Sequence, residues 1–447
     1  MITLTPLEPW IREKASIGAA LTGKDFTETL EAYQLSKINE TIDYARRNTA
    51  FYAKQLAFTG VPLKNLSDIA TIPFTKPSDL SQNPFDFLAV RQDEIARIVT
   101  LRTSGSTGEA KRLFFTEADL ELTIDFFHHG MSTLVQPRQR VAVLLPGEKP
   151  DSVGDLLRRG LLRMNIDVLP YGPVTEPVHA AHAIASFGAH CLVGIPTQVL
   201  AVAQSSKSLR LDRGSIKNIL LSTDYVPKAI TNTLHEIWGC RVFNHYGMTE
   251  MGLGGGVDCE TLSGYHLREA DLYFEVIDHA TGEACPNGTI GEVVFTTLTR
   301  QGMPLIRYRS GDVARMISEP CRCGSVLRRM EWVRGRWSGV VRLGHNCILT
   351  LPDIDEALFR LNGLLDYRVM LSKGPEKKLH LHIDVRRAEG FSPTDHEVLE
   401  CLNKIDAIQR SIAGASLEVP TVCFSTGDGW ATTGVSKRKI IINHSFT

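Results

Sequence analysis

The sequence contains no long apolar run, and this absence excludes one class of protein. No stretch approaches the roughly 18 apolar residues that a membrane-spanning helix needs. The first residues also lack a basic segment followed by an apolar one, so we expect no secretory signal peptide. Cysteine is scarce: nine residues, an odd number, are spread over 447 positions. Such usage is typical of reduced thiols, and it predicts a cytoplasmic protein without a membrane partner.

An excess of charge of one sign is also missing. The 49 lysine and arginine residues nearly balance the 50 aspartate and glutamate residues, for a formal net charge of −1. A nucleic-acid-binding protein usually carries a basic surplus, so we expect no nucleic-acid partner. With 43% hydrophobic and 22% charged residues, the composition is that of an ordinary globular protein. At roughly 150 residues per domain, the length predicts two to four domains.

The hydrophobic periodicity predicts an α/β fold. The first ninety residues are expected to form helices and loops, with a helix at 25–48. Strands and helices then alternate, which is typical of βαβ units and a parallel sheet. The strands are expected at 95–101, 140–145, 166–171, 190–194, 218–222 and 241–245, and the helices at 117–134, 153–164, 179–187, 197–204 and 229–238. A β-rich portion follows (273–278, 291–297, 305–308), and the last quarter is mixed, with a helix at 353–361 and a strand at 378–385.

A loop rich in hydroxyl groups and glycine follows the first expected strand. Its sequence, TSGSTGEAK, offers backbone and hydroxyl donors that can surround a phosphate chain, with Lys111 as a cation at its end. The residues concerned are Thr103, Ser104, Gly105, Ser106, Thr107 and Gly108. The order of a Walker A loop is absent. A simple Ser/Gly surface turn is the alternative interpretation.

Three further motifs carry groups suited to a nucleotide. In NHYGMTE (244–250), Tyr246 can stack on a base, Thr249 can donate to a phosphate oxygen, and Glu250 can hold Mg²⁺. In the segment 291–312, Asp312 follows a Ser-Gly pair and can accept two hydrogen bonds from a ribose diol. Near the C-terminus, the basic segment around Lys437 could reach a reacting phosphate, although such clusters are usually solvated faces.

The order and spacing of these motifs resemble those of the adenylate-forming superfamily of acyl- and aryl-CoA synthetases, and in particular its phenylacetate–CoA ligase branch. The resemblance covers nearly the whole chain and rests on TSGSTGEAK, NHYGMTE, GEVVFTTLTRQGMPLIRYRSGD, RMEWVRGR and the terminal SKRK. It implies a two-step reaction. A carboxylate first attacks the α-phosphorus of ATP, which gives an acyl-adenylate and pyrophosphate, and the thiol of coenzyme A then displaces AMP.

The resemblance also implies roles for individual residues. The loop 103–108 and Lys111 would hold the β- and γ-phosphates, Thr249 the α-phosphate, and Glu250 the Mg²⁺. The ribose would bind Asp312, with Arg336 nearby, and Lys437 would bridge the α-phosphate and the carboxylate. Tyr246 and the expected strand end Ser222, Thr223 and Asp224 would hold adenine. Asn244, His245 and Gly247 are also expected to bind ATP. The segment 222–225 departs from the family's usual Gly-Ala-Glu-Pro, which we regard as tolerable because adenine is contacted largely through backbone and aromatic faces.

The resemblance further implies a large N-terminal domain, 1–336, and a small mobile α+β C-terminal domain, 337–447, that swings between the two half-reactions. The usual acidic pivot is missing, and Gly339 lies close to its place. The segment 346–351 also departs from the branch's usual pattern where the thiol approaches. We therefore expect ordinary adenylation but slower thioester formation, or an acceptor other than coenzyme A.

Four metal-binding residues form another group. Cys259, His266, Cys321 and Cys323 fit the donor set of a tetrahedral Cys₃His zinc site, although the C-x-C spacing is a weak signal. The alternative is buried free thiols and a surface histidine.

The substrate is expected to be a small-molecule carboxylic acid, most readily an aromatic one. Its pocket would include Phe126 and Phe127 and the segments 146–154 and 222–225, of which 146–154 is more polar than a plain phenyl ring requires. His128 and His129 are weaker candidates for substrate contact, because adjacent residues on a helix face different directions. Two alternatives stay open: an adenylating enzyme that passes its acyl group to a carrier protein, an amine or another acceptor, and a nucleotide-binding homologue without catalysis. A homodimer is compatible with the sequence.

Overall fold

The computed structural model describes residues 2–57, 59–60, 62–101, 110–206, 211, 213–344, 347–373, 378–388, 393–425 and 438–443. The chain forms two compact units. Unit 1 comprises Met1–Pro137, Lys149–Asn165 and Phe243–Val333, and unit 2 comprises Arg138–Glu148, Ile166–Val242 and Arg334–Thr447. The second unit thus contains all of 337–447 together with earlier segments, and the domain boundary at 336 stays a prediction.

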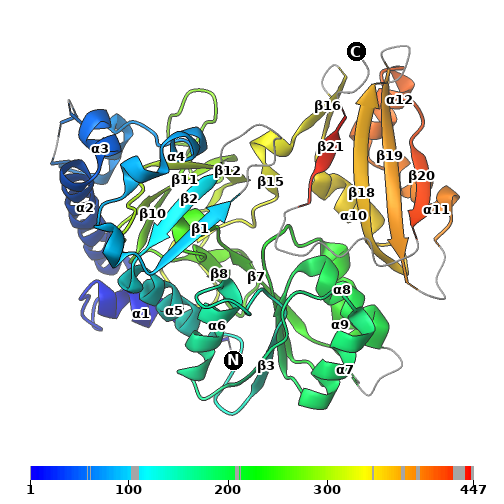
Figure 1. The fold of residues 1–447 in the computed structure, drawn as a ribbon, viewed down its shortest axis with the longest axis horizontal. Coiled ribbons are helices and arrows are strands. Elements are labelled where there is room, and N and C mark those ends of the chain that lie inside the picture. Colours follow the sequence, from blue (N-terminus) through cyan, green and yellow to red (C-terminus); the bar gives the residue numbers. More distant parts are fainter. Residues whose placement is uncertain are drawn as a thin grey trace. The chain divides into compact units, whose positions relative to one another are not determined.

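Unit 1 combines helices with antiparallel β-structure (Figure 1). Its helices are α1 (Leu7–Lys14), α2 (Gly23–Asn48), α3 (Ala50–Gln55), α4 (Pro77–Gln82), α5 (Glu117–Met131) and α6 (Val153–Leu162), with 3₁₀ turns at η1 (Leu66–Thr71), η2 (Pro84–Phe87), η3 (Gln92–Glu94) and η5 (Thr249–Met251). A hairpin joins β1 (Arg97–Leu101) to β2 (Lys111–Phe115), with Leu101 opposite Lys111.

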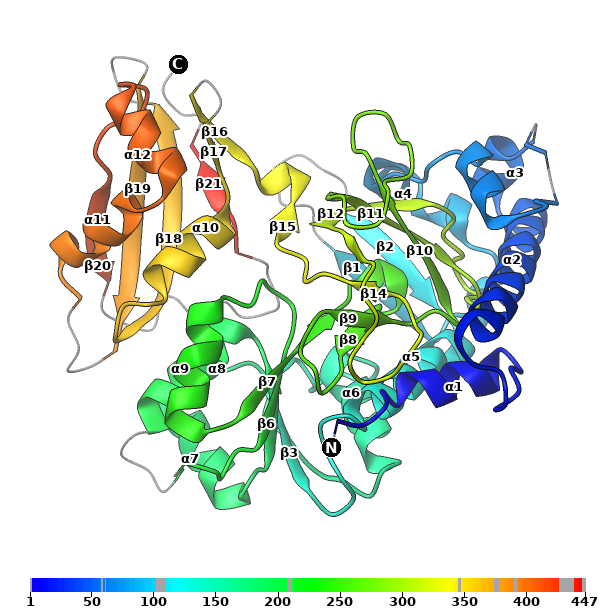
Figure 2. The ribbon, with the colours of Figure 1, turned by 180° about the vertical axis from the view of Figure 1, so that it is seen from behind.

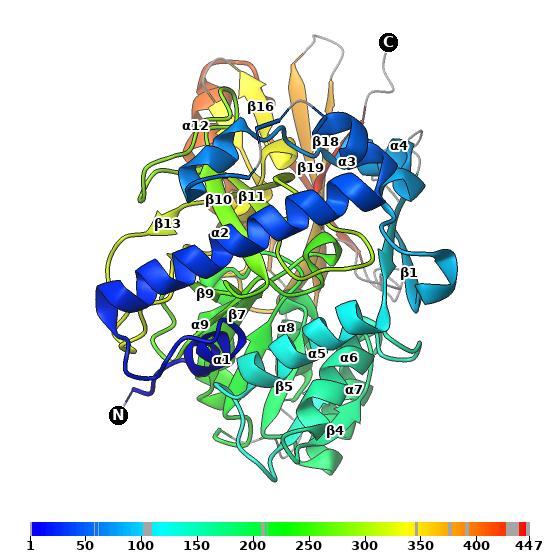
Figure 3. The same ribbon diagram turned by 90° about the vertical axis from the view of Figure 1, so that its left-hand side faces the viewer.

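Two antiparallel sheets complete unit 1. One has the order β10 (Leu272–Ile277), β11 (Gly291–Thr297), β12 (Tyr308–Ala314). The other has the order β13 (Met316–Ile317), β14 (Arg329–Met330), β9 (Tyr265–Leu267), β8 (Gly256–Asp258), β7 (Arg241–Tyr246), the last of which begins in unit 2. Helix α2 contacts β11 and crosses this part of the molecule (Figure 3) with an apolar stripe that includes Phe26, Leu30, Ile38 and Ile42.

Unit 2 contains the parallel sheet that the alternating pattern predicted. Its order is β6 (Asn218–Leu221), β5 (Cys191–Gly194), β3 (Arg140–Val143), β4 (Asp167–Pro170), and its helices are α7 (Pro177–Phe187), α8 (Pro196–Ser205) and α9 (Lys228–Trp238). Helices α7 and α9 end at Gly188 and Gly239, whose φ values of 65° and 69° are the left-handed geometry that glycine adopts without strain.

The C-terminal part of unit 2 is built around a mixed sheet of order β20 (Thr421–Ser425), β19 (Leu379–Arg387), β18 (Leu364–Lys373), β21 (Ile440–Ile442). Helices α11 (Asp395–Asn403) and α12 (Asp406–Ala413) are drawn beside this sheet, and α11 contacts β20 (Figure 2). Before it lie β15 (Gly335–Arg336), η6 (Trp337–Gly339), β16 (Val341–Gly344), β17 (Cys347–Leu349) and α10 (Leu351–Leu358).

The α/β class is confirmed, but one expected strand is wrong. The sequence placed a strand at 305–308, whereas β12 begins at Tyr308. Arg307 has a φ of 46°, which is incompatible with an extended strand, and the preceding residues form a loop in which the Leu305 carbonyl accepts from Thr297. Among the described residues, no helix is both long and apolar enough to cross a membrane.

Candidate functional site

Two of the predicted site residues meet in unit 1. Lys111 is the first residue of β2, and Glu250 lies on the η5 turn that follows β7. The Lys111 Nζ is 2.9 Å from the Glu250 Oε1. The hydroxyl of Tyr308, at the start of β12, lies 3.2 Å from each of these two atoms. The carboxylate is buried and the ammonium nearly so, which makes this a partly desolvated ion pair completed by a phenol.

A buried arginine, Arg300, contacts the main chain next to this group. The Arg300 Nη1 donates to the main-chain carbonyl of Glu250 at 2.6 Å, and its Nη2 donates to the Phe114 carbonyl at 3.3 Å. Its guanidinium also lies over the Phe115 ring, 4.3 Å from the centroid. Burial lowers the pKa of Arg300, while the nearby carboxylates of Asp119 and Glu250 favour the charged form. Arg300 therefore ties the strand that carries Lys111 to the turn that carries Glu250.

Tyr246 and Asp312 form a second contact in the same unit. The Tyr246 hydroxyl donates to the Asp312 Oδ2 at 2.9 Å, and both side chains are buried. The Tyr246 ring stacks on Tyr265, with centroids 5.7 Å apart. The Ser-Gly pair before Asp312 does not form a turn between elements: Asp312 lies inside β12, at a bulge where Gly311 has a φ of 74°. The predicted adenine-binding and ribose-binding residues are thus direct neighbours.

The rest of the 244–250 motif supports the fold around this contact. Asn244 donates from its main-chain N and its Nδ2 to the Asp258 Oδ2, at 2.8 and 2.9 Å. Burial raises the pKa of Asp258 to about 6. A Cβ at Gly247 would lie 2.2 Å from the Leu253 carbonyl oxygen, so only glycine fits there. Thr249 opens the η5 turn.

His245 and the two expected pocket phenylalanines belong to one buried cluster. The His245 ring centroid lies 6.1 Å from those of both Phe126 and Phe127, and burial lowers the pKa of this histidine to about 4. A Cβ at Gly254 would come within 2.3 Å of Phe126, so the backbone closes over that ring. Phe126 is therefore a core residue in this structure.

The expected site residues Ser222, Thr223, Asp224 and Arg336 are in unit 2. The first three follow β6, and Thr223 has a left-handed φ of 83°, which is unusual for a β-branched residue. Asp224 accepts from the Arg438 Nε at 3.1 Å. Arg438 also pairs with Asp355 at 2.9 Å. Arg336 ends the short strand β15. Thr103, Ser104, Gly105, Ser106, Thr107, Gly108 and Lys437 lie outside the described residues.

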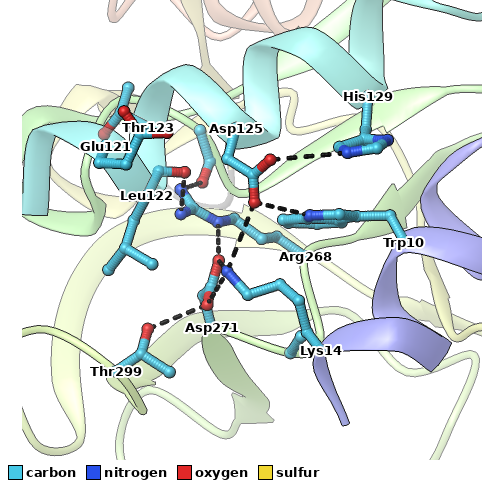
Figure 4. Close-up of polar contacts among 12 residues, drawn as sticks. Trp10, Lys14, Glu121, Leu122, Thr123, Asp125, His129, Arg268, Asp271 and Thr299 are labelled. Carbon is cyan, nitrogen blue, oxygen red and sulfur yellow. Dashed lines mark hydrogen bonds and ion pairs between the residues drawn. The ribbon is translucent and has the colours of Figure 1, made fainter. Parts of the chain in front are cut away.

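His129 contributes to a polar cluster at the N-terminal end of the chain (Figure 4). Asp125 accepts from the Trp10 Nε1 at 2.8 Å and lies 3.5 Å from the His129 Nε2. Although burial favours its neutral form, these hydrogen bonds and the charge of Lys14 lower the pKa of Asp125. Lys14 also pairs with Asp271 at 2.9 Å, and Asp271 in turn pairs with the buried Arg268 (Figure 4). These contacts anchor α1 to α5. The contact with Asp125 gives His129 a structural role in this cluster.

The structure brings the four expected metal ligands together. Cys259 follows β8, His266 lies on β9, and Cys321 and Cys323 lie between β13 and β14. All four are buried, and their ligand atoms lie within 4.8 Å of one another. The sulfurs of Cys259 and Cys321 are 3.6 Å apart, and the Cys323 sulfur is 3.5 Å from the His266 Nε2. A tetrahedral zinc ion with ordinary bond lengths requires about 3.8 Å between sulfurs and about 3.6 Å between sulfur and nitrogen. The donor set and its spacing fit zinc.

Sequence reasoning missed Tyr308 and Arg300. Both belong to the segment 291–312, which was singled out for Asp312 alone. The available signal was that this segment, already expected to bind a nucleotide, also contains a basic residue and a phenol. Neither has a recognisable spacing to Lys111 or Glu250, because the contacts join positions 50 to 197 residues apart.

Comparisons with known proteins find relatives over most of the chain. The family model described as "AMP-binding enzyme" matches residues 49–299, more than half of the chain. A phenylacetate–coenzyme A ligase from Thermus thermophilus is 29% identical over 411 residues, which are 86% of this chain and 89% of that protein. One from Escherichia coli is 27% identical over 347 residues, or 75% of each chain.

Solved structures of related fold are also CoA ligases. A 2-hydroxyisobutyryl-CoA ligase in the postadenylation state, in complex with 2-HIB-AMP, has a TM-score of 0.76 at 20% identity over 93% of this chain and 90% of that one. An anthranilate CoA ligase in complex with anthranoyl-AMP has a TM-score of 0.54 at 15% identity over 78% and 68% of the two chains. At these identities the likeness shows the fold, and the family model identifies the membership. The chain belongs to the family of AMP-binding enzymes.

Proposed function

We propose that this protein uses ATP to activate a carboxylic acid as an acyl-adenylate, releases pyrophosphate, and transfers the acyl group to coenzyme A. The observation that carries the proposal is the contact of Lys111, Glu250 and Tyr308 in a member of the AMP-binding enzymes. A cation for phosphates and a carboxylate for a metal lie side by side, as activation of ATP requires. The named relatives are phenylacetate–coenzyme A ligases, which supports the same reaction class.

The chemistry explains why such a site suffices. A carboxylate is a poor acylating agent because oxide is a very poor leaving group, whereas AMP is a good one. Displacement at phosphorus needs positioned reactants and neutralised oxygens more than covalent help. Lys111 would neutralise the leaving β- and γ-phosphates with the loop 103–108, and Thr249 would donate to the α-phosphate. Lys437 would stabilise the charge that develops between the α-phosphate and the attacking carboxylate.

The nucleoside would be held by Tyr246 and Asp312. Tyr246 offers its ring face to adenine, and Asp312 offers its carboxylate to the ribose hydroxyls. The Tyr246 hydroxyl donates to the Asp312 Oδ2, which brings the two proposed nucleoside contacts together. Asn244, His245 and Gly247 would shape the surroundings of these two residues through the fold. That Ser222, Thr223, Asp224 and Arg336 also bind ATP stays a prediction from the family resemblance.

Magnesium is the cation we propose at Glu250. Carboxylate oxygens are the ligands that Mg²⁺ prefers, and the Oε1 atom already accepts an ammonium at 2.9 Å, so the position is suited to positive charge. When bound, the ion would neutralise phosphate oxygens during the displacement.

We further propose a structural zinc ion at Cys259, His266, Cys321 and Cys323. Four protein ligands leave no open position for catalysis, and the site joins β8 and β9 to the loop between β13 and β14. All nine cysteines are free, which supports a reducing, cytoplasmic location.

For the substrate we propose an aromatic carboxylic acid. The support is the names of the relatives and the aromatic residue Phe127 beside His245. Because Phe126 is closed into the core, we no longer propose it as a substrate contact. The segments 146–154 and 222–225 stay predictions.

Acid-dependent exchange between ATP and labelled pyrophosphate tests the first step without assuming an acceptor. A panel of aromatic and aliphatic acids should reveal exchange with at least one aromatic acid. No exchange with any acid would contradict the proposal. Offering a synthetic aryl-adenylate and coenzyme A then isolates the second step, in which residues 337–447 would swing about Gly339. Slow thioester formation beside rapid exchange would favour a different acceptor, such as a carrier-protein thiol or an amine.

A further inference from the structure

The charges of Lys111 and Glu250 compensate each other in this structure. The carboxylate of Glu250 accepts from the ammonium at 2.9 Å and from the Tyr308 hydroxyl at 3.2 Å. Tyr308 is fully buried, and only a small part of either charged side chain reaches solvent. Water therefore screens the pair poorly, and each charge depends strongly on its neighbour.

Each ligand of the proposed reaction takes one partner away from the other. An ATP molecule without a metal draws the ammonium of Lys111 to its phosphates and adds negative charge beside a buried carboxylate. A divalent cation alone draws the carboxylate of Glu250 and adds positive charge beside the ammonium. When both bind, the phosphates compensate Lys111 and the cation compensates Glu250. The two binding events should thus favour each other.

Arg300 weakens this dependence without removing it. Its guanidinium stays near Glu250 when Lys111 moves, but its Nη1 donates to the main-chain carbonyl and not to the carboxylate. The carboxylate of Asp119 also contributes to the electrostatics of this arginine. The expected coupling is therefore on the order of tenfold rather than the larger loss seen when a buried charge is left with no compensation.

We propose that Lys111 and Glu250 form a charge-balanced latch that makes nucleotide and divalent cation bind cooperatively, so that neither binds well alone. This inference rests on the proposed function, because it takes the ligands of the pair to be ATP and a divalent metal. It makes one unusual prediction. Removing the charge of the proposed metal ligand should improve the binding of metal-free ATP, because Lys111 is then released from its partner.

Isothermal titration calorimetry of the whole protein tests the nucleotide side. ATP is titrated in excess EDTA and in excess Mg²⁺, with wild type, Glu250→Gln and the control Glu13→Gln, which removes one exposed carboxylate on α1. Wild type and the control should bind ATP about tenfold more weakly in EDTA than in Mg²⁺. Glu250→Gln should bind ATP in EDTA about tenfold more tightly than wild type does, and Mg²⁺ should change its affinity less than threefold. Unchanged or weaker binding of metal-free ATP by Glu250→Gln would overturn the latch.

The reciprocal experiment does not depend on that variant. Mn²⁺ is titrated without nucleotide and followed by electron paramagnetic resonance, with wild type and Lys111→Met. Loss of the ammonium should tighten Mn²⁺ binding about tenfold, because the Glu250 carboxylate no longer pairs with Lys111 and the cation no longer meets a neighbouring positive charge. Equal Mn²⁺ affinities would overturn the latch even if Glu250→Gln failed to fold. An absence of ATP binding to wild type in both EDTA and Mg²⁺ would instead contradict the proposed function.

Discussion

Replacement of Arg300 by methionine tests whether this residue positions the site. The change removes two hydrogen bonds from a charged donor to the carbonyls of Glu250 and Phe114. Hydrogen bonds to charged groups contribute about 1.5–3 kcal/mol each, and the flat contact with Phe115 adds about 1 kcal/mol. Methionine fills a similar volume and relieves the desolvation of the guanidinium, so we expect a net loss of about 2–3 kcal/mol in the free energy of unfolding.

The functional consequence should be seen in the metal dependence of exchange. With its carbonyl released, the η5 turn should no longer hold Glu250 at a fixed distance from Lys111. We expect the Mg²⁺ concentration for half-maximal ATP–pyrophosphate exchange to rise about tenfold, which corresponds to a loss of about 1.4 kcal/mol in the free energy of Mg²⁺ binding. Arg300→Lys should have a Mg²⁺ requirement between those of wild type and Arg300→Met. Lysine keeps the positive charge but lacks the planar guanidinium that donates to both carbonyls.

The control is Arg12→Met on α1, which removes an arginine bond to the Leu21 carbonyl together with the ion pair between Arg12 and Glu8. It should lower stability without changing the Mg²⁺ requirement. Urea unfolding and the Mg²⁺ titration of exchange are measured on all variants. If Arg300→Met lost stability but kept the wild-type Mg²⁺ requirement, Arg300 would support the fold alone and our reasoning about Glu250 would be refuted.

Three further predictions concern other parts of the chain. Lys437→Ala should lower acid-dependent exchange by about 10²–10³ because it removes a cation from the developing charge; unchanged exchange would assign that role to Lys439 or Lys111. Protein purified without a histidine tag should contain one zinc per chain by elemental analysis, and Cys321→Ser combined with Cys323→Ser should abolish it; a metal-free wild type would contradict the site. Burial raises the pKa of Asp355 to about 7, so the folded protein holds this proton more tightly than the unfolded chain does, and stability should fall as pH rises from about 4 to 7. In urea unfolding at several pH values, Asp355→Asn should lose this fall in stability between about pH 4 and 7. The same pH dependence in the variant as in wild type would contradict the raised pKa of Asp355.

Hydrophobic periodicity predicted the helices and strands whose apolar spacing can be seen within one short segment of the sequence. The helix at 25–48 and the alternating strands and helices of 140–245 appear within a few residues of their expected bounds, because their apolar spacing is set by burial on one side or on both. The strand expected at 305–308 failed because the apolar residues Leu305 and Ile306 fill the core from a loop. Arg307, whose backbone is left-handed, separates that loop from β12. The hydrophobic pattern of a sequence contains no information about such a backbone conformation.

Site residues were predictable only where a motif carried the chemistry in its own sequence. Lys111, Glu250 and Asp312 stand in recognisable motifs, and the four expected metal ligands share a donor chemistry that narrows the choice. Tyr308 and Arg300 act through contacts with residues far away in the sequence, and a phenol or a guanidinium alone indicates no partner. Such positioning residues require the three-dimensional structure.

The central claim is that the acid is activated through an acyl-adenylate. The most direct test incubates the protein with Mg²⁺, ATP, coenzyme A and an aromatic acid whose carboxylate carries ¹⁸O in both oxygens, followed by mass spectrometry of the products. Attack of the carboxylate on the α-phosphorus predicts that one labelled oxygen appears in AMP and the other in the acyl-CoA. Label in inorganic phosphate, with ADP as the nucleotide product, would show an acyl-phosphate route and contradict the account.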